Sequence, residues 1–140
     1  MKGKAFFDTN VLVYAMDTNE PEKAQIAKNL IQQYGEAGNL VLSTQVLQEL
    51  YVTLTKSGKI GLSKNEAQLI VNALAEYPLV QVNKELIALA MERNNGNQYS
   101  FWDSLIVEAA LQSGCKILFT EDMHNNATEG TLTLLNPFLI

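Results

Sequence analysis

Short apolar runs alternate with longer amphipathic segments along the 140-residue chain. The short runs predict buried strands, and they are AFF (5–7), LVLS (40–43), LVQV (79–82), KILFT (116–120) and TLTLL (131–135). The longer segments predict helices that start at Val11, at Pro21, at Ser43 or Thr44, at Ser63, after Asn83 and at Phe101. Strands that alternate with helices predict an α/β fold with a mainly parallel sheet of about five strands. We expect a single three-layer α/β/α domain over residues 1–140.

Residues at the starts of these segments support the helix assignments. Pro21 suits the first turn of a helix. Ser63 is followed three residues later by Glu66, which is a capping-box pattern. Asn83 and Ser100 are favourable residues for the cap position.

The composition is that of a folded globular protein, with 47% hydrophobic and 18% charged residues. The single cysteine, Cys115, excludes an intrachain disulfide and the usual cysteine-based zinc sites. No apolar run approaches the roughly 18 residues of a membrane helix, and the N-terminus lacks a signal-peptide pattern. We therefore expect a cytoplasmic protein that does not contact the membrane.

Four acidic residues occupy notable positions. Two follow predicted strands at the same edge of the sheet, and two lie on or beside apolar helix faces, where carboxylates are unusual. Asp8 follows the first strand, and Asp122, beside Glu121, follows the fourth. Parallel sheets bind ligands at the carboxyl ends of their strands. Asp103 has apolar residues three, four and seven positions later on its own helix face, and Glu49 lies on the flank of an apolar helix face.

Each acid taken alone has an ordinary explanation. Asp8 suits a turn, with Thr9 or Asn10 capping the helix from Val11. Asp103 completes a capping box with Ser100, Glu49 suits a solvated flank, and Asp122 suits a loop. Four carboxylates brought together repel one another, however, and a hard divalent cation relieves that repulsion. Oxygen ligands without clustered cysteine or histidine favour Mg²⁺ or Mn²⁺.

The net charge of −5 argues against a broad basic face that holds nucleic acid. It does not exclude a local site at which bound cations reverse the charge. Without the four acids, the chain would have 10 basic and 11 acidic residues, close to neutral.

Four segments in order resemble the PIN-domain ribonucleases, in particular the VapC-like toxins of bacterial toxin–antitoxin pairs. They run from Phe6 to Phe138, and they are FFDTNVLVYA, QVLQELY, YSFWDSLIVEAA and ILFTEDMHN followed by NPF. The resemblance implies a PIN-like fold in which Asp8, Glu49, Asp103 and Asp122 are the catalytic and metal-binding acids. It also implies supporting polar roles for Asn10 and Thr120 and, more weakly, for Thr9 and Ser104. The loop MHNNATEG departs from the family, which often has a glutamine and a glycine there, and a role for Glu121 beside Asp122 stays open.

The resemblance implies Mg²⁺- or Mn²⁺-dependent hydrolysis of RNA phosphodiester bonds by a metal-activated water, which leaves 5′-phosphate and 3′-hydroxyl ends. It further implies a small antitoxin as partner and a homodimer. The alternative is a non-catalytic PIN-like or receiver-like module with an acidic pocket. A receiver needs an acidic pair after the first strand and a lysine after the last, and neither is evident.

Contacts with the RNA are expected from a few residues outside the acidic set. Lys56 and Lys59, near Lys64, surround one loop and are candidates for steering the RNA backbone. Phe101 and Trp102 adjoin Asp103 and are candidates for stacking on a base. Core packing is expected to account for at least one of them, so Tyr99 is the freer candidate for stacking. His124, the only histidine, is left outside the catalytic set.

Overall fold

The computed structural model describes residues 3–58 and 60–139. Within them, six strands form one sheet in the order β3-β2-β1-β4-β6-β5. The strands are β1 (Ala5–Phe7), β2 (Leu40–Ser43), β3 (Leu79–Val80), β4 (Ile117–Phe119), β5 (Thr128–Glu129) and β6 (Leu132–Leu135). All neighbouring pairs are parallel except β5 and β6. The expected α/β fold with a mainly parallel sheet is confirmed, with one strand more than anticipated.

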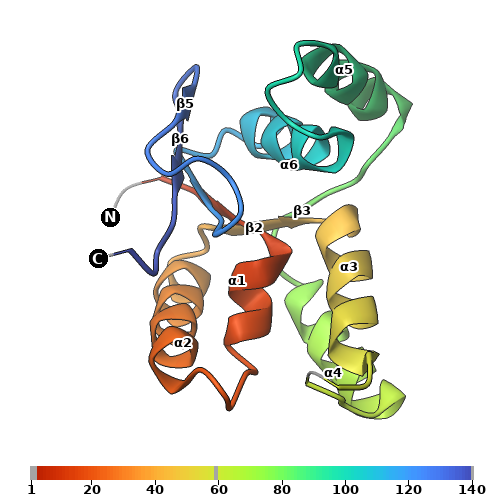
Figure 1. Ribbon diagram of the computed structural model, residues 1–140, viewed down its shortest axis with the longest axis vertical. Coiled ribbons are helices and arrows are strands. Elements are labelled where there is room, and N and C mark those ends of the chain that lie inside the picture. The colour runs from red at the N-terminus through yellow and green to blue at the C-terminus, as the bar shows by residue number, and fades with distance from the viewer. Residues whose placement is uncertain (1–2, 59, 140) are drawn as a thin grey trace.

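The helices cover the two faces of the sheet unequally. They are α1 (Thr9–Tyr14), α2 (Pro21–Glu36), α3 (Thr44–Thr55), α4 (Lys64–Leu74), α5 (Lys84–Asn95) and α6 (Phe101–Gln112). Helices α1 to α4 lie on one side, and α5 and α6 lie on the other (Figure 1). The chain changes sides after β3 and returns to pair β4 with β1. The boundary between the two halves of the sheet therefore lies at β1 and β4, where doubly wound sheets bind ligands.

The core lies along both faces of the central strands. Every residue of β1 and β2 is buried, as the short apolar runs predicted. Phe7 contacts Tyr34 and Phe119 edge to face, with ring centroids 5.8 and 5.3 Å apart. Cys115 is a buried free thiol. In the described part of the chain, no helix is long and apolar enough to cross a membrane.

Two local expectations were wrong and one strand was missed, each for a physical reason. The first short helix begins at Thr9 and not at Val11, and Asp8 itself caps it by accepting from the Thr9 amide. The third strand ends at Val80 because the Val82 amide donates to the Thr44 hydroxyl, 3.1 Å away, and leaves the ladder. The two-residue strand β5 was missed because its residues, Thr128 and Glu129, are partly or fully exposed and have no apolar pattern.

Candidate active site

The register of β1 and β4 places Asp8 beside Thr120. Phe7 pairs with Phe119, and the Asp8 amide continues the ladder by donating to the Phe119 carbonyl oxygen, 3.0 Å away. The Thr120 hydroxyl donates to Asp8 Oδ2 at 2.8 Å, and the Thr9 amide donates to Asp8 Oδ1 at 2.7 Å. Both oxygens of the carboxylate are thus held in one orientation by backbone geometry and a buried hydroxyl.

Burial dominates the acid–base behaviour of Asp8. The residue is 7% exposed, and desolvation raises the pKa of its carboxyl from 3.8 to about 6. The hydrogen bonds from Thr120 and the Thr9 amide act in the opposite direction, and the charges of Glu49 and Asp103 add to the increase. The folded protein therefore keeps this carboxylate ionised at neutral pH only at a cost in free energy.

Glu49 is held from two directions on α3. The Thr9 hydroxyl donates to Glu49 Oε1 at 2.7 Å, and Gln45, one helical turn earlier, donates from Nε2 to Oε2 at 3.1 Å. The same Gln45 amide group donates to the Trp102 carbonyl oxygen at 3.3 Å, so it links α3 with α6. Gln45 Oε1 is buried without a hydrogen-bond partner among the described residues. The amide cannot be rotated to exchange its atoms, because that would place oxygen against two acceptors.

Asp103 lies in the first turn of α6, which Ser100 caps by accepting from the Asp103 amide at 3.1 Å. Burial raises the pKa of its carboxyl, the charge of Asp122 adds the next largest contribution, and that of Glu49 adds further. The Ser100 cap predicted for this helix is confirmed. The Asp103 carboxyl group also lies close enough to Asp122 and Glu49 for their charges to raise its pKa.

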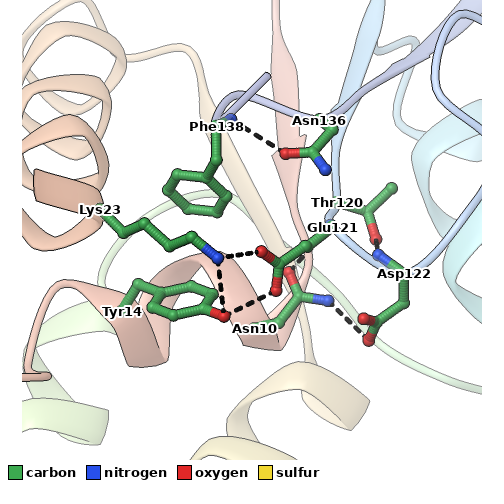
Figure 2. Close-up of polar contacts among 8 residues, drawn as sticks. All are labelled: Asn10, Tyr14, Lys23, Thr120, Glu121, Asp122, Asn136 and Phe138. Carbon is green, nitrogen blue, oxygen red and sulfur yellow. Dashed lines mark hydrogen bonds and ion pairs between the residues drawn. The ribbon is translucent and has the colours of Figure 1, made fainter. Parts of the chain in front are cut away.

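Asp122 is exposed and is placed by the loop that follows β4. Asn10 Nδ2 donates to Asp122 Oδ2 at 2.8 Å, while Asn10 Oδ1 accepts from the Glu121 amide at 3.3 Å. The Asp122 amide donates to the Thr120 hydroxyl oxygen at 3.3 Å. Figure 2 shows Asn10 spanning from α1 to this loop. Asn10 thus orients the Asp122 carboxylate, and Thr120 orients that of Asp8.

Glu121 lies beside Asp122 but is paired with a cation. Lys23 Nζ donates to Glu121 Oε2 at 2.6 Å, and the Tyr14 hydroxyl donates to Oε1 at 2.8 Å. The Lys23 ammonium also lies over the rings of Tyr14 and Phe138, 4.6 and 5.4 Å from their centroids (Figure 2). This cluster anchors the Asp122 loop to α1 and α2.

All four predicted acids line one cavity of about 470 Å³ at the carboxyl ends of β1 and β4. Within the described residues, no three His, Cys, Asp or Glu side chains are close enough together to hold an ion directly. A Mg²⁺ ion commonly takes one or two carboxylates and keeps several waters. The donor set and the space in the cavity suit that mode of binding, and they do not suit a cage of three direct carboxylate ligands.

Of the weaker candidates, Thr9 lines this cavity, whereas Ser104 and Lys56 do not. The Ser104 hydroxyl donates to the Ser100 carbonyl oxygen at 2.8 Å, so its proton is not available to a carboxylate. Lys56 is exposed at the end of α3, seven residues beyond Glu49 and about 10 Å along the helix axis. Lys59 lies outside the described residues.

The expectation that Tyr99 is freer than Trp102 to stack on a base was wrong. It is 7% exposed, and its hydroxyl donates to Glu129 Oε2 at 2.8 Å. Trp102 is instead 62% exposed and lines the acidic cavity. Sequence reasoning also missed Gln45, although its position four residues before Glu49 was a signal that it could reach that side chain.

The fold and the site together define an α/β domain with a carboxylate-lined cavity at the switch point of its sheet. The PIN domain profile matches residues 5–128. The chain therefore belongs to the PIN domain family, as the four sequence segments indicated, and the receiver-like alternative is excluded.

Solved structures share this fold over most of their length. The Mycobacterium tuberculosis toxin VapC20, described as cleaving the sarcin-ricin loop, superposes with a TM-score of 0.65 at 21% identity. That match covers 85% of this chain and 90% of VapC20. A toxin–antitoxin complex from Klebsiella pneumoniae gives a TM-score of 0.70 at 17% identity, covering 98% of this chain and 100% of the other. No curated protein matches the chain in sequence.

Proposed function

We propose that this chain is a Mg²⁺- or Mn²⁺-dependent endoribonuclease and the toxin of a toxin–antitoxin pair. The observation that carries the proposal is the convergence of Asp8, Glu49, Asp103 and Asp122 on one cavity from four separate segments. Membership of the PIN domain family and the shared fold with a toxin that cleaves RNA support the choice of substrate. The proposed partners are the RNA substrate, a small antitoxin and a second copy of the chain, all in the cytoplasm.

The residues of the cavity orient carboxylates and bind a hydrated cation. Thr120 and the Thr9 amide fix Asp8, Thr9 and Gln45 fix Glu49, and Asn10 fixes Asp122. When bound, the divalent ion supplies a water of lowered pKa and neutralises charge on the phosphate. Because the carboxylates are already oriented, less entropy is lost when the reacting groups are positioned. Competition between cation and proton for Asp8 makes cation affinity rise with pH through about 6.

The decisive experiment measures cleavage of a mixed RNA pool with Mg²⁺ or Mn²⁺, with and without EDTA. The wild type is compared with Asp8→Asn and Asp103→Asn, and with Glu85→Gln as a matched carboxyl-to-amide change at an exposed residue of α5. We expect chelation and both aspartate substitutions to abolish cleavage, while Glu85→Gln leaves it unchanged. Cleavage that survives EDTA or either aspartate substitution overturns the mechanism. Inactivity of the wild type with both metals favours the non-catalytic PIN-like alternative.

A further inference from the structure

Trp102 is an exposed indole at the rim of the acidic cavity. It is the only tryptophan in the chain and is 62% exposed, although tryptophan is usually largely buried. The described residues include seven exposed large hydrophobic side chains, at positions 16, 52, 69, 89, 91, 102 and 139. Trp102 is the only one of these seven that lines the cavity of the four acids. Trp102 therefore presents exposed apolar surface at the site.

Trp102 is contacted by neighbouring residues through both its ring and its backbone. The Phe101 ring contacts it edge to face, with centroids 5.2 Å apart and an angle of 69° between the planes. The Trp102 carbonyl oxygen accepts from Gln45 Nε2 at 3.3 Å, so α3 anchors this turn of α6. A ring that already packs on a neighbouring ring loses less conformational freedom when a ligand covers it.

The side chains that line the cavity favour an uncharged contact with the substrate. Its described lining has four acids of the proposed site together with Asp17 and Glu121, and it contains no lysine or arginine. A nucleic acid gripped mainly through its phosphates needs such cations. Stacking of a base on an aromatic ring adds affinity without charge, and loss of one such contact weakens binding by roughly ten- to a hundredfold.

We infer that Trp102 is a stacking platform for one unpaired nucleobase of the RNA, next to the phosphate that is cleaved. The inference rests on the proposed function and narrows its substrate class. Trp102 and Asp103 both line this cavity, so a base stacked on the indole lies next to the reacting phosphate. Bases within a continuous duplex are stacked on each other and do not reach the ring, so the substrate is a single-stranded or loop segment.

Because Trp102 is the only tryptophan, its intrinsic fluorescence reports on this one site. We would titrate the full chain, with EDTA and separately with Ca²⁺, with three 12-nucleotide probes: a mixed single-stranded RNA, its duplex and an abasic ribose-phosphate oligomer. The single strand is expected to quench the fluorescence and to bind at least tenfold more tightly than the other two. Equal binding of the abasic oligomer, or no quenching by the single strand, overturns the inference.

Variants separate stacking from catalysis and from self-association. Trp102→Ala is expected to raise KM about tenfold or more with little change in kcat. Trp102→Phe is expected to recover most of the lost affinity. Leu69→Ala, at an exposed position on α4, is expected to leave both constants unchanged. Unchanged KM in Trp102→Ala overturns the inference even if cleavage is metal-dependent. Quenching by RNA in a chain that does not cleave supports stacking while the proposed nuclease function fails. Sedimentation of the wild type and of Trp102→Ala shows whether a second copy of the chain covers the indole. A dimer that Trp102→Ala dissociates would overturn the inference, because the second copy would then contact the indole in place of a nucleobase.

Discussion

Replacing Asp8 with asparagine is expected to stabilise the metal-free fold at neutral pH while it removes the proposed activity. Asparagine has nearly the same shape, and its oxygen accepts from the Thr9 amide as Asp8 does. The substitution removes the buried charge, and it reverses the hydrogen bond with Thr120, whose hydroxyl oxygen accepts from the new amide group. Burial raises the pKa of the Asp8 carboxyl from 3.8 to about 6, so ionisation is less favourable in the folded chain than in the unfolded chain.

The sign and size of the effect follow from that difference. Well below pH 3.8, the carboxyl is protonated in both states and contributes nothing to the pH dependence. As the pH rises, the unfolded chain loses its proton first, and the free energy of unfolding falls until the folded carboxyl has also ionised, above about pH 6. The difference between the two pKa values corresponds to a loss of about 3 kcal/mol. Asp8→Asn does not undergo this loss.

Urea unfolding in EDTA, followed by circular dichroism from about pH 4 to about pH 8, measures the effect. The stability advantage of Asp8→Asn is expected to be small at the acidic end and to grow to about 3 kcal/mol by pH 7. Asp122→Asn is the matched control, because this carboxylate lines the same cavity but is exposed to solvent. Its difference from the wild type should stay within about 0.5 kcal/mol. If the wild type is as stable as Asp8→Asn at pH 7, Asp8 does not carry the cost of a buried charge.

Three further predictions test other parts of the molecule. Mn²⁺ at a hundred times its Kd should stabilise the wild type by about 2.7 kcal/mol in thermal scans at pH 7.5, reversibly with EDTA, and Asp8→Asn should lose most of this gain. Gln45→Met removes the donor to Glu49 and also the buried oxygen that has no partner. We therefore expect kcat to fall at least tenfold, while the free energy of unfolding changes by about 1 kcal/mol or less. Equal losses of activity and stability would mean a purely structural role. Arg93→Met leaves the largely buried Glu108 and Glu129 without their cation. Urea unfolding should therefore show that the free energy of unfolding falls by about 2–4 kcal/mol, with RNA cleavage at 25 °C retained. An unchanged free energy of unfolding would show that the ion pairs do not stabilise the packing of α5 on α6 and β5.

Much of the fold could be predicted because its signals are local. Buried strands have short apolar runs, and the caps at Ser63 and Asn83 were confirmed, since a cap depends on residues within one turn. The errors lie where a distant contact decides. Strand β5 exists because it pairs with β6, and the early end of β3 depends on the Thr44 hydroxyl, 38 positions from Val82. Asp8 caps α1 because its backbone continues the ladder with β4 and sets the carboxylate at the start of the helix.

By itself, the sequence determined which residue types are available: four acids at strand ends and on inward helix faces, in the order of the PIN domain family. Only the tertiary structure decided how they are held and which aromatic reaches solvent. Tyr99 and Trp102 are three positions apart in one segment, yet a hydrogen bond to Glu129 accompanies the burial of the first, while the second stands at the rim of the cavity. Exposure and the pKa of a carboxyl depend on the atoms that surround a side chain, and here those atoms come from segments more than 100 positions apart, as in the pairing of Asp8 with Thr120.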